Sequence, residues 1–262
     1  MPKILNRVGE KRKNSYGTEM IIIGYINSLN IIVEFKDKHK YRSKTTYSAF
    51  KNGNVSNPYD KTICDIGCLG IGNHTERKLI LNQKAYKCWK GILERCYNFK
   101  KYNYHRNYVY EECQICDNWL VFNNFADWFD MNYYEIENRI SCLDKDIISK
   151  GNKIYSPETC IFVPDNINKL FTKSNKIRGG LPIGVSSEGS KFRASISTNC
   201  IIGKKEGKSK EYLGSYNTPE EAFEAYKKFK ENYIKKVADY YKDRIPKKLY
   251  DAMYGYEIHI DD

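Results

Sequence analysis

The chain has 262 residues, which is long enough for two or three small domains, each with its own core. Its 44 Lys and Arg residues against 32 Asp and Glu residues give a formal net charge of +12, which favours a polyanionic partner such as nucleic acid. Because the sequence holds neither a bilayer-spanning apolar run nor the apolar core of a signal peptide, we expect a cytoplasmic protein with no membrane partner, whose nine cysteines are reduced thiols.

The N-terminal part of the chain is basic and then turns to strand-like patterns. Residues 1–14 carry cations without periodicity and are predicted to form a basic, mobile arm that adds phosphate contacts. Residues 15–72 are predicted to form a small antiparallel β domain, since apolar runs alternate with turn signals such as Asn52-Gly53. The candidate strands are Met20–Ile23, Ile31–Phe35 and Tyr41–Tyr47. We expect a stabilising or docking module here; direct contact with DNA is the alternative.

The next region, residues 83–171, opens with two amphipathic helices. Apolar residues recur at helical spacing over 83–97 and 118–131, and their aromatic side chains are expected to form a core. Between the helices, Cys113 and Cys116 have the spacing of zinc ligands, but a structural zinc site requires two more. Two readings stay open for this pair: buried thiols, and a zinc site completed by residues from elsewhere.

The stretch Ser141–Leu170 is expected to contain strands, a turn-rich loop and a short helix. The segments 142–148 and Cys160–Val163 are apolar enough for strands, and Asp165 can cap the helix that follows. An acid at the end of the first strand and an amide on the helix can meet across such a unit. This is how a ββα-metal nuclease site holds a divalent cation that polarises a phosphodiester.

The sequence LDKD…GNKIYSPETC…N in this stretch resembles the phage HNH-type, homing-endonuclease-like family. The resemblance implies that Asp144 and Asn168 bind Mg²⁺ or Mn²⁺ and that the protein acts in a phage-infected bacterial host. It places Lys145 where the family has its catalytic histidine; Asp146 or a metal-bound hydroxide is the alternative base. The non-catalytic alternative is a salt bridge between Asp144 and Lys145 that closes the hairpin.

A polar linker, residues 172–181, leads into a second unit at 182–246. Three short strands are expected there, and Thr218-Pro219-Glu220-Glu221 predicts a helix that begins with a capping box. The unit resembles the Apetala-type, ethylene-response-factor-like DNA-binding domain, which implies that its sheet lies in the major groove. Arg193 is then expected to reach a guanine edge, with Ser195 as a second DNA-binding residue. The lysines expected to contact phosphates are Lys191, Lys204, Lys205, Lys208 and Lys210.

The tail, residues 247–262, is apolar and acidic and is expected to pack on the body or on another subunit. The predicted fold class is therefore α+β, with several small domains. Two hypotheses about function follow. The first is a metal-dependent DNA endonuclease; the second is a catalytically inactive protein that binds double-stranded DNA as a regulator, or that inhibits a host defence system by binding a host protein.

Overall fold

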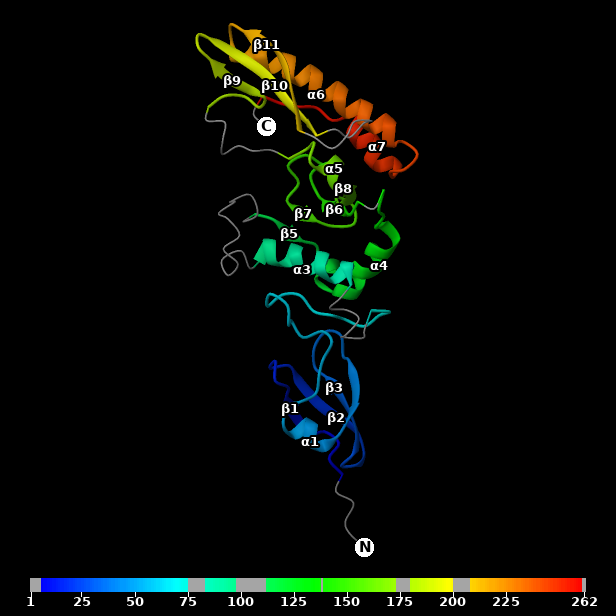
Figure 1. Cartoon of the computed structure of the whole chain (residues 1–262). Helices are drawn as coiled ribbons and strands as arrows, with labels where there is room; N and C mark the ends of the chain where they lie inside the picture. Colours follow the sequence, from blue (N-terminus) through cyan, green and yellow to red (C-terminus); the bar gives the residue numbers. More distant parts are fainter. Residues whose placement is uncertain are drawn as a thin grey trace. The chain divides into compact units, whose positions relative to one another are not determined.

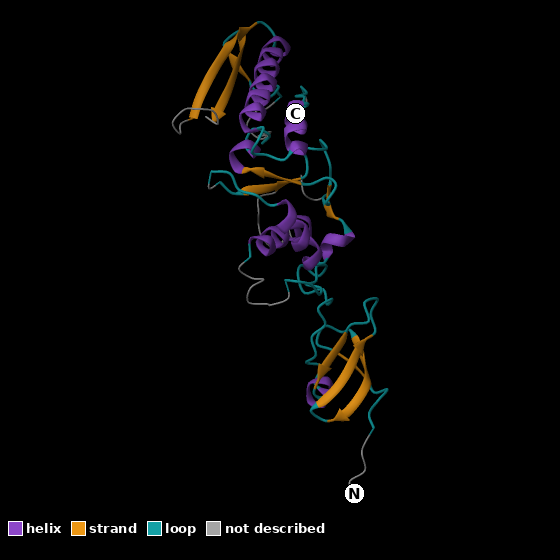
Figure 2. Ribbon diagram, turned by 90° about the vertical axis from the view of Figure 1, so that its right-hand side faces the viewer, coloured by secondary structure: helices purple, strands orange, loops and turns teal. Residues whose placement is uncertain are grey.

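The computed structural model describes residues 6–74, 83–97, 112–137, 139–172, 180–199 and 208–260 (Figure 1). The chain divides into two compact units, which we call unit 1 (residues 1–131) and unit 2 (residues 132–262). Small sheets and helices are mixed in the chain (Figure 2), so the predicted α+β class is confirmed. Within the described ranges, every helix is too short or too polar to cross a membrane.

Unit 1 begins with a small sheet and continues with helices. Its elements are β1 (Lys11–Lys13), β2 (Glu19–Asn27), β3 (Asn30–Phe35), β4 (Arg42–Thr45), α1 (Tyr47–Lys51), α3 (Lys84–Tyr97), β5 (Gln114–Ile115), the 3₁₀ helix η2 (Asp117–Leu120) and α4 (Phe122–Asn132). Unit 2 holds β6 (Ser141–Asp144), β7 (Ile154–Tyr155), β8 (Ile161–Pro164), α5 (Asp165–Asn168), β9 (Val185–Glu188), β10 (Lys191–Asn199), β11 (Lys208–Tyr216), α6 (Pro219–Tyr241) and α7 (Lys247–Tyr254).

The sheet of unit 1 is an antiparallel meander in the order β1-β2-β3-β4. Alternate residues of β2 and β3 point to one face, where they form a buried core with α1; this core comprises Met20, Ile22, Ile31, Val33, Phe35, Phe50 and Val55. The predicted strands at Met20–Ile23 and Ile31–Phe35 are thus confirmed in position, and the strand predicted at Tyr41–Tyr47 is present but ends at Thr45, because Thr46 caps α1. The basic arm is shorter than predicted, because Lys11–Lys13 pair with β2 through the backbone, which needs no apolar periodicity.

Aromatic side chains hold the helical part of unit 1 together. Trp89 of α3 and Trp119 of η2 are fully buried, and Trp89 Nε1 donates a hydrogen bond to the Trp119 carbonyl oxygen at 2.6 Å. The ring of Phe122, the first residue of α4, packs on Trp89 with centroids 5.3 Å apart. The helices predicted at 83–97 and 118–131 are therefore confirmed, with the second one preceded by a 3₁₀ turn.

In unit 2, β6 and β8 form a short antiparallel ladder, with Asp144 opposite Ile161 and Ser141 opposite Pro164. The one-turn helix α5 follows β8 directly and packs on both strands. The predicted strand–loop–strand–helix order is thus present. Residues 146–148, however, form bends instead of continuing the strand, because the Asp144 side chain accepts hydrogen bonds from the backbone N–H groups of Asp146 and Ile147, as described below.

The second sheet of unit 2 has the antiparallel order β11-β10-β9 and packs one face against α6. Thr218 Oγ1 accepts from the Glu221 N–H at 3.2 Å, and Glu221 Oε2 accepts from the Asn217 N–H at 3.1 Å, so the predicted helix start is confirmed. The close packing at β9 requires a glycine: a Cβ at Gly184, whose φ is +80°, would lie 2.1 Å from the Tyr226 ring.

Helix α6 contributes to two cores, and Figure 1 shows it running from the β9–β10–β11 sheet to α7. Its N-terminal half packs through Ala222, Phe223 and Tyr226 on the three-stranded sheet. Its C-terminal half packs with β8, α5 and α7, through Ile234, Val237, Ala238 and Tyr241. One compact unit thus contains residues from both the predicted region 83–171 and the predicted region 182–246, whose boundaries stay a prediction. The tail packs on the body: Leu249 and Met253 are in one core, and Ile258 is in the other.

Candidate nucleic-acid interface and candidate metal centre

The face of the β9–β10–β11 sheet opposite α6, which we call the outer face, is polar and basic. In β10, Ala194, Ile196 and Thr198 are buried toward α6, so the alternate residues face outward. The antiparallel register then assigns their cross-strand partners to the same face. The outer face consists of Ser186, Glu188, Lys191, Arg193, Ser195, Ser197, Lys210, Tyr212 and Ser215.

Arg193 of β10 is held on the outer face by neighbours from the two adjacent strands, β9 and β11. Its Nη1 lies 3.3 Å from Glu188 Oε1, and its guanidinium carbon lies 4.8 Å from the centre of the Tyr212 ring. Ser215 Oγ donates to the other carboxylate oxygen of Glu188 at 3.0 Å. Stacking and a charged hydrogen bond therefore fix the plane of the guanidinium, while its Nε is buried and has no hydrogen-bond partner among the described residues. The Arg193 side chain keeps 40% of its surface exposed.

The other sequence-predicted DNA-binding residues divide into three groups. Lys191 and Lys210 are exposed on the same face as Arg193. Ser195 lies opposite Tyr212, next to the bulge of the β10–β11 ladder, and is half-buried. Lys208 begins β11. Lys204 and Lys205 lie outside the described residues.

Sequence reasoning missed Glu188 and Tyr212, the two residues that fix Arg193. Tyr212 lies on β11, one of the three strands expected in this unit, but the bulge between Ala194 and Ser195 shifts the register by one residue. Without the bulge, alternation alone does not assign Tyr212 to the face of Arg193. The signal that could have identified Glu188 is its position as an isolated acidic residue directly before the turn at Gly189.

The predicted metal ligand Asp144 caps a turn at the end of β6. Its Oδ1 accepts hydrogen bonds from the backbone N–H groups of Asp146 and Ile147, both at 2.8 Å. Burial raises the pKa of the Asp144 carboxyl group, against the opposing effect of those two N–H donors. The carboxylate therefore has a clear structural role, which uses one of its oxygens.

Lys145 is locked into the same loop. Its Nζ donates to both carboxylate oxygens of Asp146, each at 2.8 Å, and to the carbonyl oxygen of Asn152 at 2.7 Å. The Asn152 amide in turn donates to the Lys145 carbonyl oxygen at 3.1 Å. The lysine is thus paired with Asp146, and the Asp144–Lys145 salt bridge considered from the sequence is replaced by this pair. An ammonium engaged as a donor in this way has no lone pair with which to accept a proton.

Asn168 occupies the last position of α5 and is half-buried. Among the described residues, no hydrogen bond joins its side chain to Asp144, Lys145 or Asp146. A second amide of α5, Asn166, was not singled out from the sequence. Its Nδ2 donates to the Tyr241 hydroxyl at 3.0 Å, while its buried Oδ1 lacks a partner within the described part of the chain. Asn166 therefore connects α5 to α6. Sequence reasoning missed it because no periodic pattern marks this position.

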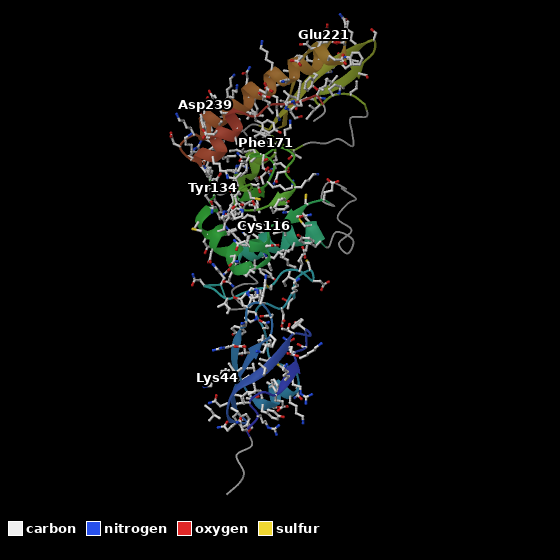
Figure 3. All side chains as sticks on the ribbon, turned by 180° about the vertical axis from the view of Figure 1, so that it is seen from behind. Lys44, Cys116, Tyr134, Phe171, Glu221 and Asp239 are labelled. Carbon is white, nitrogen blue, oxygen red and sulfur yellow. The ribbon has the colours of Figure 1, made fainter. Side chains whose placement is uncertain are left out.

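Asp144 and Asn168 offer the oxygen donors that Mg²⁺ and Mn²⁺ prefer. In the described ranges, the structure contains no group of three or more His, Cys, Asp and Glu residues that could hold a metal ion. Cys113 is buried and directly precedes β5, while Cys116 (Figure 3) directly follows β5 and precedes η2.

Comparisons with protein-family models, with curated proteins and with solved structures found no match for this chain.

Proposed function

We propose that this chain binds double-stranded DNA through the outer face of the β9–β10–β11 sheet. The observation that carries the proposal is the preorganised guanidinium of Arg193, which Tyr212 and Glu188 hold on the face opposite α6. A rigid arginine fork matches the two acceptors of a guanine edge in the major groove. The formal net charge of +12 supports a polyanionic partner.

The residues of the outer face have different roles in this proposal. Arg193 reads a base edge, because only base edges carry sequence information. Lys191 and Lys210 contact phosphates and set affinity. Glu188 positions Arg193 and also competes with DNA for it, so a bound duplex keeps the stacking on Tyr212 while it takes over part of the hydrogen bonding.

Fluorescence anisotropy with labelled duplexes at several salt concentrations tests the proposal. Arg193→Ala is expected to weaken binding by about tenfold and to reduce the preference between sequences, as expected for loss of one bidentate base contact. Lys191→Ala is expected to weaken binding to all sequences alike and to lower the salt dependence by about one phosphate contact. Lys247→Ala on α7 is the control, since it removes one charge from an exposed lysine of the same unit. Duplex binding that is absent, or equal in Arg193→Ala and Lys247→Ala, would overturn the proposal.

Metal-dependent DNA cleavage is the second candidate function. It is favoured by the β6–β8 ladder with α5 packed on it and by the half-buried acid at the end of β6. A divalent cation held by Asp144 and Asn168 would polarise a phosphodiester. Because Lys145 is engaged as a hydrogen-bond donor, it is unsuited to act as the general base. Asp146, whose side chain is exposed, is the better candidate for that role.

Supercoiled plasmid incubated with Mg²⁺ or Mn²⁺ separates the two functions. Nicking that requires metal and is lost in Asp144→Ala supports the nuclease. Since Asp144 also caps a turn, Asn168→Ala provides a second variant that leaves the turn intact. Duplex binding without nicking in either metal leaves the inactive DNA-binding regulator, including one that interferes with a host system, as the function.

A further inference from the structure

The hairpin that joins β2 and β3 exposes aliphatic side chains at its tip. Leu29 is 78% exposed and Ile26 is 68% exposed, and Ile32 on β3 is 40% exposed. The residues from 26 to 32 have the sequence INSLNII and contain no charged side chain. Large aliphatic side chains gathered at one exposed end of a sheet are typical of a contact surface, whereas isolated ones are common everywhere. We call residues 26–30 the hairpin tip.

The hairpin tip has a fixed conformation. Asn27 Oδ1 accepts from the Leu29 N–H at 2.9 Å, and the Ser28 carbonyl oxygen accepts from the N–H of Tyr47 on α1 at 2.8 Å. The first hydrogen bond closes the turn within the tip, and the second attaches the tip to α1. Leu29 and Ile26 are therefore presented to solvent by a rigid backbone, and their insertion into a partner would cost little ordering entropy.

The strands behind the hairpin tip carry positive charge on the same face as Ile32. Ile32 lies opposite Lys44 of β4, and the Lys44 side chain is exposed (Figure 3). The next row of cross-strand partners on this face runs from Lys11 on β1 through β2 and β3 to Arg42 on β4. The acids of this face, Glu19 and Glu34, form ion pairs with its cations, and Glu19 lies 3.5 Å from Lys11. Glu34 binds both Lys36 at 3.0 Å and Arg42 at 2.9 Å, which lowers the pKa of its carboxyl group.

We infer that the hairpin tip is a second DNA-binding element, which inserts Leu29 and Ile26 between base steps from the minor groove and bends the duplex. Apolar wedges of Leu or Ile flanked by cations and amides are the means by which minor-groove proteins unstack and kink DNA. The tip supplies the wedge, and Asn27 and Asn30 supply amides at the groove floor. Lys44, with Lys11 and Arg42 of the next row, faces the phosphates. The inference rests on the proposed DNA binding.

The position and charge of these side chains favour DNA over a protein partner. The aliphatic residues lie at the end of a hairpin beside Asn27 and Asn30, whereas protein recognition by apolar anchors buries them in a pocket within a broad interface. A second copy of this chain is disfavoured as the occupant, because two such faces would bring cations against cations. A wedge between stacked bases needs no pocket and gains from every flanking cation.

The test measures bending and unstacking of a mixed-sequence duplex of about 30 base pairs, a length on which a kink is readily seen. Fluorescence resonance energy transfer between dyes at the two ends reports the bend, and 2-aminopurine at successive TA and CA steps reports unstacking. The full-length protein is expected to bend the duplex by about 20–90° and to raise 2-aminopurine fluorescence at one step. Leu29→Ser is expected to abolish both signals and to weaken binding by about tenfold, the scale of burying one leucine side chain.

Met131→Ser is the matched control, because Met131 is also 78% exposed but lies on α4. It is expected to bend DNA like the unaltered protein. Ile26→Ser provides a second tip variant, and circular dichroism checks that each variant is folded. A protein that binds the duplex without bending it, or a Leu29→Ser variant that bends it fully, overturns the wedge but leaves the outer-face proposal intact. Absence of all duplex binding overturns both. Loss of affinity in Arg193→Ala without loss of bending at saturation separates the two elements.

Discussion

Lys230, near the middle of α6, is a buried lysine whose replacement should stabilise unit 2. The side chain is only 9% exposed, between the part of α6 that packs on the sheet and the part that packs on α7. Burial lowers the pKa of Lys230 to about 8, from the ordinary lysine value of 10.5. At about 1.4 kcal/mol for each pKa unit, this difference corresponds to a cost of about 3 kcal/mol at neutral pH.

The cost has a definite dependence on pH. Above a pH of about 8 the folded protein holds a neutral amine, while the unfolded chain stays protonated up to its own pKa of 10.5. The unfolded state therefore binds more protons in this window, and stability rises with pH. Lys230→Met removes the cost, so the variant should exceed the unaltered protein by about 3 kcal/mol at pH 7 and by only about 1.5 kcal/mol at pH 9.5.

Denaturant unfolding followed by far-ultraviolet circular dichroism measures this gain, because α6 is the longest helix in the described part of the chain. The three tryptophans all lie in unit 1, so their fluorescence reports that unit separately and should not change. Lys236→Met, an exposed position on the same helix, is the control and should leave stability nearly unchanged at every pH. An equal effect of the two substitutions, or a gain from Lys230→Met that does not shrink toward pH 9.5, would refute the reasoning.

Two further substitutions test local contacts. Thr218→Ala removes the N-cap of α6, whose Oγ1 accepts from Glu221, and should cost about 1 kcal/mol in unfolding of unit 2 by circular dichroism. Asp60→Ala should destabilise unit 1 by about 2–3 kcal/mol, since the buried carboxylate accepts from Asn14 and Thr18, both at 2.6 Å. Faster amide hydrogen exchange in β1 and β2 would show the second effect, and unchanged exchange there would contradict it.

The elements that the sequence predicted correctly have local causes. The start of α6 at Pro219 follows from a capping box that is complete within four residues. Strands β2 and β3 follow from alternation, with Ile22 and Val33 on the core face. In each case the residues that decide the structure are neighbours in the chain, so a pattern in the sequence is sufficient.

The features that the sequence could not predict depend on side-chain contacts across the fold. Residues 146–148 have the composition of a strand, but Asp144 binds two N–H groups of this segment and Lys145 closes the loop on Asn152. The same contacts give Asp144 and Lys145 structural roles, although the family resemblance assigns Asp144 to metal binding and Lys145 to the position of the catalytic base. On the outer face, the register shift at Ala194/Ser195 decides that Tyr212 stacks on Arg193.

The predicted domain boundary at residue 246 gives a last test, because α6 is shared between two cores. In a fragment of residues 182–246, the partners of Ile234, Val237 and Tyr241 would be missing, and Ile258 would be lost from the other core. Exposure of these side chains costs roughly 5 kcal/mol in all, which is comparable with the whole stability of a small domain. We therefore expect the fragment 182–246 to lack cooperative unfolding, whereas the fragment 132–262 should unfold cooperatively. Equal, well-dispersed NMR spectra of the sheet residues in both fragments would instead mean that the sheet and the first half of α6 fold as a self-sufficient domain.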